Sequence, residues 1–385
     1  MSRPLIRTLM LLVLVLLLVI ISHRPLLKLV GIALPYGQGG IAEIQVPPGF
    51  TVSVYADGLD RPRFMAVGPD GTVYVAERGA GRVVALPDDD GDGSADQYIT
   101  VAEGLDNPSS LAFYDHLLYV GETTRVTRFG LGADRVATER VVIVPDLPAG
   151  GNHTTRTVLI GQDERLYVSI GSSCNVCHEE DPRRAAVLVY NLDGSNGRIF
   201  ARGLRNAVGI AVNPWTGEIW ATNNGRDLWG DDRPPETVYI LKDGADYGWP
   251  RCHAGNLPDP DFLGGCAGVA TPAIIMQAHS APLGMVFYNT GAFPSAYHGL
   301  YIALHGSWNR SVPVGYKIVH VPLVDGQVAG PVEDFATGWL RPDGSSFGRP
   351  VGLVVARDGS LLISDDKAGM IYRIAWTGGS NTIAP

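Results

Sequence analysis

Basic and amide side chains recur at one position of a repeated segment, directly before a short apolar strand. In chain order they are Arg61, Asn107, His153, Arg205, Asn206 and Arg349. Imidazole is a natural proton acceptor near neutral pH, and Arg binds carboxylates through paired N–H groups. Strands that converge would therefore offer an anionic ligand several cations and a general base. We predict His153 as that base, with His305 as the next candidate.

An acidic turn between two predicted strands has the spacing of an EF-hand-type calcium loop. Its carboxylates stand at loop positions 1, 3, 5 and 9, and Gly93 stands at position 6, where the chain must turn sharply. The acid of position 12 is missing, and a solvated acidic turn is the alternative. We expect a structural calcium ion whose ligands are Asp88, Asp90, Asp92 and Asp96.

The four cysteines form two local pairs, Cys174 with Cys177 and Cys252 with Cys266. Two disulfides are the simple interpretation for a chain that folds in an oxidising compartment. The first pair is followed by His178, so it also matches the C-x-x-C-H pattern of haem attachment. A c-type haem normally needs a small helical domain around it, whereas this motif follows a strand of the repeat.

The repeated pattern occurs six times, as a polar or Pro-containing start, an apolar strand, a turn and a second strand. Its first strands lie in residues 61–67, 107–113, 153–160, 205–212, 281–287 and 349–355. The early copies are about 46 to 52 residues apart, near the length of a propeller blade, and the longer later gaps must hold inserted loops. Because a blade buries both faces only between neighbours, we predict an all-β, six-bladed β-propeller.

Composition narrows the function. The chain has 385 residues, 48 Gly and 27 Pro, which suits many short strands and tight turns. Its net charge of -9 and the lack of Lys and Arg clusters argue against a nucleic-acid partner. The sequence contains no G-x-G-x-x-G after a strand, Walker loop, G-x-S-x-G or H-E-x-x-H. Nicotinamide, nucleotide and simple hydrolase functions therefore lose most of their support.

The amino terminus carries an export signal. Arg3 and Arg7 precede an apolar run from Leu9 to Ile21, and no clear cleavage site follows. We favour an uncleaved transmembrane signal-anchor helix over a cleaved signal. The expected organisation is an anchor over residues 1–34, a Gly- and Pro-rich linker over 35–44 and the propeller over 45–378. The positive-inside rule then places an inner-membrane-anchored propeller in the periplasm.

Several motifs along the repeats carry a family resemblance. They are LPAGGNHTTRTVLIG, GLRNAVGIAV, NNGRD followed by DYGWP, HGSWNR, and GRPVGL with DGSLLISDD. In this order they resemble the pyrroloquinoline quinone (PQQ)-dependent sugar dehydrogenases. The similarity is strongest to the sorbosone dehydrogenase-like branch, with soluble glucose dehydrogenase as a more distant relative, and it spans about residues 45 to 376. It implies bound PQQ and calcium.

The resemblance also implies roles for single residues. His153 takes the position of the general base that accepts the substrate hydroxyl proton, and Arg205 and Asn206 match a pair that touches the quinone. Backbone carbonyls of the family hold calcium against the cofactor at the positions of Asn223, Asn224, Gly225 and Arg226. A stretch that supplies a cationic cofactor contact corresponds to His305, Trp308, Asn309 and Arg310. Arg349 matches an Arg of the family's last blade.

Three departures from soluble glucose dehydrogenase put details in doubt. Leu105 and Asp106 replace an amide that contacts sugar, Val351 replaces a second cofactor-binding Arg, and Asn152 replaces the acid beside the catalytic His. The substrate and the group that orients the imidazole therefore need not be those of that enzyme.

The sequence as a whole predicts a periplasmic PQQ-dependent oxidoreductase. It would oxidise a sugar-type alcohol or aldehyde, such as sorbosone or an aldose, and pass electrons to a quinone or cytochrome of the respiratory chain. The alternatives are a lactonase-type metal hydrolase and a non-catalytic ligand-binding propeller, because propellers share topology without sharing function.

Overall fold

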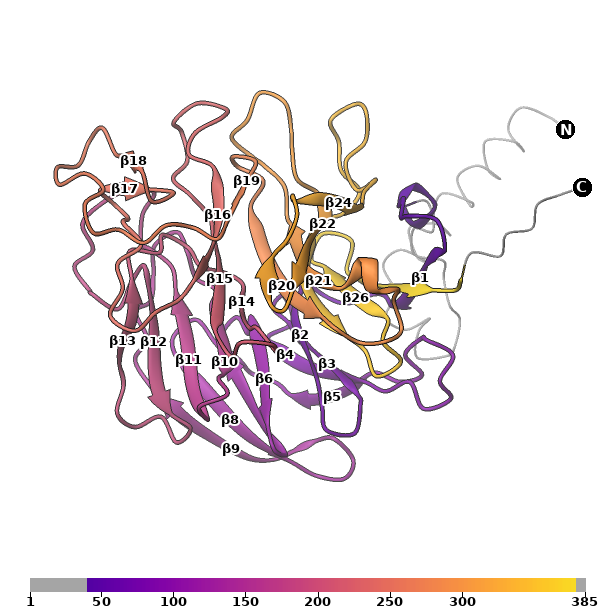
Figure 1. Cartoon of the computed structure of the whole chain (residues 1–385). Helices are drawn as coiled ribbons and strands as arrows, with labels where there is room; N and C mark the ends of the chain where they lie inside the picture. The colour runs from indigo at the N-terminus through magenta and orange to yellow at the C-terminus, as the bar shows by residue number, and fades with distance from the viewer. Residues whose placement is uncertain (1–39, 379–385) are drawn as a thin grey trace, which may run out of the picture. The chain divides into compact units, whose positions relative to one another are not determined.

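Each repeated segment forms one antiparallel sheet of the computed structural model, which describes residues 40–378 (Figure 1). Blade 1 contains β2 (Pro62–Val67), β3 (Val73–Glu77), β4 (Arg82–Leu86) and β5 (Ile99–Ala102). Blade 2 contains β6 (Ser110–Tyr114), β7 (Leu117–Gly121), β8 (Val126–Leu131) and β9 (Ala137–Val144). Blade 3 contains β10 (Arg156–Ile160), β11 (Arg165–Ile170), β12 (Ala186–Asn191) and β13 (Arg198–Arg202).

The later blades carry the insertions expected from the longer gaps. Blade 4 contains β14 (Ile210–Val212), β15 (Ile219–Asn223), β16 (Glu236–Ile240) and β19 (Ile274–Met276), with the hairpin β17 (Cys252–His253) and β18 (Leu257–Pro258) inserted before β19. Blade 5 contains β20 (Pro282–Tyr288), β21 (Gly299–Leu304), β22 (Lys317–Val324), β23 (Gln327–Val328) and β24 (Glu333–Ala336). Two short 3-10 helices are η1 (Ile41–Glu43) and η2 (Ser295–Tyr297).

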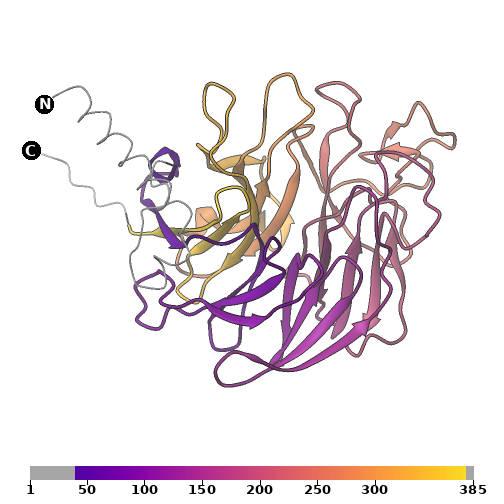
Figure 2. The ribbon, with the colours of Figure 1, turned by 180° about the vertical axis from the view of Figure 1, so that it is seen from behind.

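Blade 6 closes the ring with strands from both ends of the chain. It contains β25 (Pro350–Val355), β26 (Leu361–Asp365), β27 (Met370–Trp376) and β1 (Phe50–Ala56), and β1 pairs antiparallel with β27 (Figure 2). The six first strands contact one another in sequence, from β2 through β6, β10, β14, β20 and β25 back to β2. The predicted six-bladed propeller is confirmed.

The core lies between blades, as the repeat predicts. Six apolar clusters each join two neighbouring sheets, and the one between blades 5 and 6 includes the fully buried Trp339. The second strand of a blade packs on both sides, so β3 and β21 are buried along their whole length. A smaller cluster of Val208, Leu283 and Val351 fills the centre of the ring. Val351 thus belongs to the apolar floor of the channel.

A recurrent hydrogen bond holds the segment that precedes a first strand. The acid at the end of the second strand accepts a hydrogen bond from a backbone N–H of that segment, which fixes where the segment lies. The bonds are Asp60 N to Glu77 Oε1 at 2.7 Å, Asp106 N to Glu122 Oε2 at 2.7 Å and Arg349 N to Asp365 Oδ1 at 2.8 Å. In blade 4 the Asn223 amide oxygen accepts from Asn206 N at 3.2 Å.

The predicted signal anchor over residues 1–34 lies outside the described residues. Within residues 40–378 no helix has the length and apolar character needed to cross a membrane.

Candidate active site

A cavity of about 370 Å³ lies where the first strands of the blades begin, above the apolar floor. Most of the predicted site residues line it, namely His153, Arg205, Asn206, Asn224, Gly225, His305, Trp308, Asn309 and Arg349. Residues 61 and 107 do not, although they occupy the predicted position in blades 1 and 2. The Arg61 side chain is 62% exposed, and the Asn107 amide binds its neighbour Asp106.

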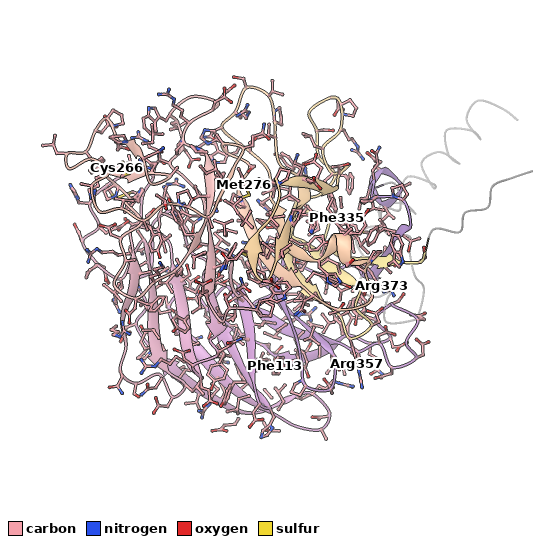
Figure 3. All side chains as sticks on the ribbon, viewed as in Figure 1. Phe113, Cys266, Met276, Phe335, Arg357 and Arg373 are labelled. Carbon is pink, nitrogen blue, oxygen red and sulfur yellow. A yellow bond between two sulfur atoms is a disulfide. The ribbon has the colours of Figure 1, made fainter. Side chains whose placement is uncertain are left out.

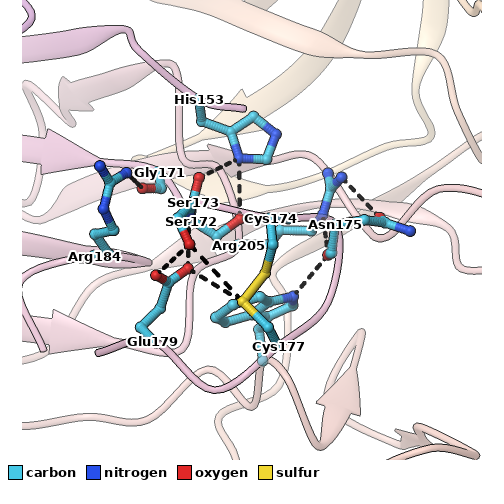
Figure 4. Close-up of a disulfide and its surroundings, with 11 residues drawn as sticks. His153, Gly171, Ser172, Ser173, Cys174, Asn175, Cys177, Glu179, Arg184 and Arg205 are labelled. Carbon is cyan, nitrogen blue, oxygen red and sulfur yellow. Dashed lines mark hydrogen bonds between the residues drawn. A yellow bond between two sulfur atoms is a disulfide. The ribbon is translucent and has the colours of Figure 1, made fainter. Parts of the chain in front are cut away.

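His153 is held by a single neighbouring residue. Its Nδ1 lies 2.9 Å from the Ser172 carbonyl oxygen and 3.0 Å from Ser172 Oγ (Figure 4). A proton on Nδ1 that is donated to the carbonyl leaves Nε2 as the proton acceptor. Burial, and then the charge of Arg205, lower the pKa of His153 to about 3, so the imidazole is neutral at pH 7. Ser172 therefore takes the orienting role that Asn152 lacks.

Gly171 allows this arrangement because a side chain there would collide with the site. A Cβ at Gly171 would lie 2.5 Å from Asn206 Oδ1 and 2.6 Å from His153 Cβ. Only glycine permits so close an approach of the backbone.

Arg205 is 3% exposed, and acceptors of the protein surround its guanidinium group. Nε donates to Asn175 O at 2.8 Å, Nη1 to Gly225 O at 2.5 Å, and Nη2 to Asn175 Oδ1 at 2.9 Å and Asp227 Oδ2 at 2.7 Å. Arg205 thus contributes its positive charge to the cavity and joins two loops behind it. The second of these loops is the predicted calcium-binding segment.

The predicted calcium-binding segment reaches the cavity only in part. Asn224 and Gly225 line it, and the Asn224 side chain donates to Pro282 O at 2.7 Å. Asn223 and Arg226 do not line it. The Arg226 guanidinium group is buried and forms ion pairs with Asp259 and Asp261. The placement leaves the carbonyls of Asn224 and Gly225 as the candidates among the four.

Arg310 is also turned away from the cavity. Its guanidinium group donates to Asp231 O and pairs with Asp232 at 2.9 Å. Arg310 is therefore not among the residues that line the cavity, since its charge is used between two loops at the rim. Its neighbour Asn309 does reach the cavity and donates to Asp227 Oδ1 at 3.2 Å. Trp308 lines the mouth and is 69% exposed.

Blade 1 supplies two cations that the sequence did not single out. Arg63 pairs with Asp366 at 2.7 Å, and its buried Nε has no hydrogen-bond partner in residues 40–378. Arg78 donates to Thr154 Oγ1 at 2.6 Å and forms no ion pair within the described part of the chain. Burial, and then the charges of Arg63 and Arg61, lower the pKa of Arg78.

A structural equivalence explains how Arg78 reaches the cavity. The residue after the second strand donates its backbone N–H to the segment before the first strand in three blades. These bonds are Arg78 N to Arg61 O, Asn224 N to Asn206 O and His305 N to Ala281 O. All three donors line the cavity, so this position is a second source of site residues.

Carboxyl and imidazole groups also line the cavity. Asp227 pairs with Arg205, and the fully buried Glu236 accepts a hydrogen bond from Gly225 N at 2.7 Å. Burial raises the pKa of Glu236 to about 7. His305 Nε2 lies 3.0 Å from Asp366 Oδ1, and burial lowers the pKa of His305 to about 4. His279, which also lines the cavity, bonds Gly230 O at 2.8 Å.

Arg349 completes the cationic lining. Its Nε donates to His305 O at 3.0 Å and its Nη2 to Gly306 O at 2.6 Å, while the guanidinium lies over the ring of Tyr316. These acceptors are neutral, so the charge of Arg349 is not cancelled by a carboxylate among the described residues.

The predicted structural calcium loop lies between β4 and β5, away from this cavity. Carboxylate oxygens of Asp88, Asp90 and Asp96 lie within 4.8 Å of one another, and Asp88 Oδ1 is buried without a hydrogen-bond partner in the described residues. Asp92 is outside this group and accepts from Ser94 N at 2.8 Å. A second cavity of about 350 Å³ adjoins the loop and is flanked by Arg357 and Arg373 (Figure 3).

Both predicted disulfides, Cys174–Cys177 and Cys252–Cys266, are present. Haem attachment needs free thiols, so the first bond removes the haem interpretation of the C-x-x-C-H motif. The bond also rules out a metal site formed by Cys174, Cys177 and Glu179. Within residues 40–378 these three side chains and the group of Asp88, Asp90 and Asp96 are those whose ligand atoms lie close enough together to hold an ion.

Comparisons with known proteins match this chain along most of its length. A family model described as TrAA12-like matches residues 44–256 and 264–377. The chain belongs to the TrAA12-like family. Its resemblance to the PQQ-dependent sugar dehydrogenases is thereby confirmed, while the narrower likeness to the sorbosone dehydrogenase branch stays a prediction.

Three similar proteins match the chain over most of its length. A protein of Borreliella burgdorferi is 30% identical over 86% of this TrAA12-like chain and 90% of its own length. A PQQ-dependent pyranose dehydrogenase of Coprinopsis cinerea is 28% identical over 86% of the chain, which spans 54% of that protein. The solved holo form of the PQQ domain of pyranose dehydrogenase from the same fungus superposes with a TM-score of 0.75 at 25% identity, over 86% of this chain and 97% of that one.

Proposed function

We propose that the protein is a PQQ-dependent oxidoreductase that oxidises a CH–OH group of a sugar-type alcohol or aldehyde. The observation that carries the proposal is the charge of the cavity. Four guanidinium groups, from Arg63, Arg78, Arg205 and Arg349, and only two carboxyl groups line it. Arg63 and Arg205 are paired with Asp366 and Asp227, whereas the half-buried Arg78 and Arg349 have no ion-pair partner in residues 40–378. Partly buried cations without partners are costly, so these two favour an anionic ligand.

The donor set fits PQQ, which carries three carboxylates. Arg78 and Arg349 have no ion-pair partner in residues 40–378, and Arg63 Nε is a buried donor with no acceptor there. These three residues would bind the carboxylates by charge-assisted hydrogen bonds. The backbone carbonyls of Asn224 and Gly225 offer the oxygen ligands that calcium prefers.

The chemistry of the protein follows from His153. When bound, PQQ supplies a quinone carbonyl that accepts a hydride from the substrate carbon. The neutral imidazole, held at Nδ1 by Ser172, presents Nε2 to take the hydroxyl proton of the substrate. Burial, and then the positive charge of Arg205, keep the imidazole neutral before it accepts that proton. Trp308 at the mouth offers an apolar face to an incoming ring.

Reconstitution of the isolated protein tests this function. Apo protein is titrated with PQQ in the presence of calcium, and the absorption spectrum is followed. Reduction of a dye acceptor is then measured with aldoses, sorbosone and simple alcohols. We expect a saturable spectral change and dye reduction with at least one sugar-type substrate. A protein that leaves the PQQ spectrum unchanged would contradict the proposal.

The lactonase-type alternative is less compatible with the lining. Such a hydrolase needs acidic metal ligands that face the open cavity, whereas Asp227 and Glu236 are held by Arg205 and Gly225 N among four Arg side chains. Calcium-dependent hydrolysis of lactones without PQQ would favour it.

We further propose a periplasmic location, with the propeller anchored to the inner membrane by residues 1–34 and electrons passed to a quinone or cytochrome. Two disulfides in the folded domain are consistent with an oxidising compartment, and the apolar run from Leu9 to Ile21 supports the anchor. Cell fractionation with alkaline extraction of membranes tests this. Recovery in the soluble cytoplasmic fraction would refute it.

A further inference from the structure

The loop closed by Cys174–Cys177 lies directly behind the cavity wall, between β11 and β12 (Figure 4). Residues 172–177 are not part of the lining themselves. Nevertheless, the loop contacts both His153 and Arg205, which do line the cavity. A mechanism that assigns roles only to the lining leaves this loop without a function.

Asn175, inside the disulfide ring, makes five hydrogen bonds. Its Oδ1 accepts from Arg205 Nη2 at 2.9 Å and from Asp227 N at 2.7 Å, and its Nδ2 donates to Asp227 O at 3.0 Å. Its backbone carbonyl accepts from Arg205 Nε at 2.8 Å and from Trp249 Nε1 at 3.3 Å. Both ends of the side-chain amide are therefore used, and they join Arg205 to the predicted calcium-binding segment.

The start of the same loop holds the base. Ser172 Oγ donates to the Cys174 carbonyl at 2.6 Å, and the carbonyl and hydroxyl oxygens of Ser172 lie at 2.9 and 3.0 Å from His153 Nδ1. The disulfide fixes the separation of Cys174 and Cys177, so it restricts the conformations open to the peptide between them.

We propose that Asn175 is a positioning residue of the active site and that the Cys174–Cys177 disulfide holds it in place. Its amide sets the position of Arg205 and of the Asn224–Asp227 segment. These groups supply one of the cations of the cavity and the calcium ligands of the proposed function, and this inference rests on that function. Asn175 does not line the cavity. Its effect is on binding of the cofactor rather than on the chemical step.

Hydrogen exchange of the apo protein tests the positioning without PQQ. In Asn175→Ala the amide of Asp227 loses its acceptor, so peptides that cover residues 224–229 are expected to exchange faster. Asn191→Ala is the matched control, because Asn191 bonds Ser195 Oγ in an exposed turn between β12 and β13. Unchanged exchange in Asn175→Ala would overturn the inference, even if the parent binds PQQ.

Cofactor titration tests the consequence. Asn175→Ala should bind PQQ about tenfold to a hundredfold more weakly than the parent, while kcat at saturating PQQ stays within about threefold. A parent that binds no PQQ would refute the proposed function, and the exchange result alone would then decide whether Asn175 positions the segment. A parent that binds PQQ, with an Asn175→Ala variant of equal affinity, would refute the inference alone.

A double-mutant cycle tests whether the disulfide acts through Asn175. The double substitution Cys174→Ser/Cys177→Ser should weaken PQQ binding in the parent. It should cause no further loss of affinity in the Asn175→Ala background, because both changes remove the same positioning interaction. Additive losses would overturn this part of the inference.

If Asn175→Ala does not fold, dithiothreitol treatment of the native parent replaces it. The reagent reduces the disulfide to two thiols and becomes a cyclic disulfide itself. Cys174 and Cys177 are half-buried, whereas Cys252 is 1% exposed, so selective reduction is expected. Faster exchange over residues 224–229 supports the inference, and unchanged exchange overturns it.

Discussion

Arg78 offers a sharp test of the anionic ligand because its charge opposes folding and favours binding. Arg78→Gln keeps a donor for Thr154 Oγ1 and removes the cation. A charge-assisted hydrogen bond to a carboxylate contributes about 1.5 to 3 kcal/mol, so PQQ affinity should fall about tenfold to a hundredfold. Burial and the nearby Arg63 and Arg61 lower the pKa of Arg78, so loss of this charge removes a repulsion. The melting temperature of the apo protein should therefore stay equal or rise.

The assay pairs a PQQ titration of the apo protein in calcium with its thermal melting. Arg198→Gln is the matched control, since Arg198 is 47% exposed and pairs with Asp243 on an outer turn. That control should leave PQQ affinity unchanged. Retention of the parent's affinity by Arg78→Gln, or a clear loss of its apo stability, would refute the reasoning that the charge is kept for an anionic ligand.

Three further predictions follow from the site and its surroundings. His153→Gln should lower turnover by about 10²- to 10⁴-fold with PQQ binding nearly intact. Turnover within a few-fold of the parent would mean that another residue is the general base. Because the pKa of His305 is lowered to about 4, only the unfolded chain binds its proton between pH 6.5 and 4. Unfolding free energy from urea titrations should therefore fall with acid in that window, by up to about 1.4 kcal/mol per pH unit from this group, and His305→Asn should flatten the slope. Calcium should raise and a chelator should lower the melting temperature of the apo protein, and Asp90→Asn should reduce both effects. A parent whose melting temperature responds to neither would contradict calcium binding by the acidic loop.

Sequence alone predicted the parts of the site that the repeat itself specifies. The six first strands stand where the pattern places them, and the polar residues before three of them converge. His153, Arg205, Asn206 and Arg349 could be found because each shortly precedes the apolar run of its repeat.

The missed residues sit where the repeat pattern carries no polar signal. Arg63 lies inside an apolar first strand, and Glu236 begins a strand that continues with Thr237 and then apolar residues. Arg78 had a usable signal, since aligning the ends of the second strands would have matched it with Asn224 and His305. The outward turn of Arg310 could not be foreseen, because it depends on Asp231 and Asp232, which are far from it in sequence.

The pairing of β1 with β27 has a consequence for the chain during its synthesis. Thr51 bonds Ala375, a residue 324 positions later in the chain. The ribosome releases the amino end first, so β1 has no partner until almost the whole chain has been made. An unpaired edge strand is a template for pairing with other chains. Premature termination within the last strand would leave two such edges on one molecule, and the nascent chain must be shielded until its final residues emerge.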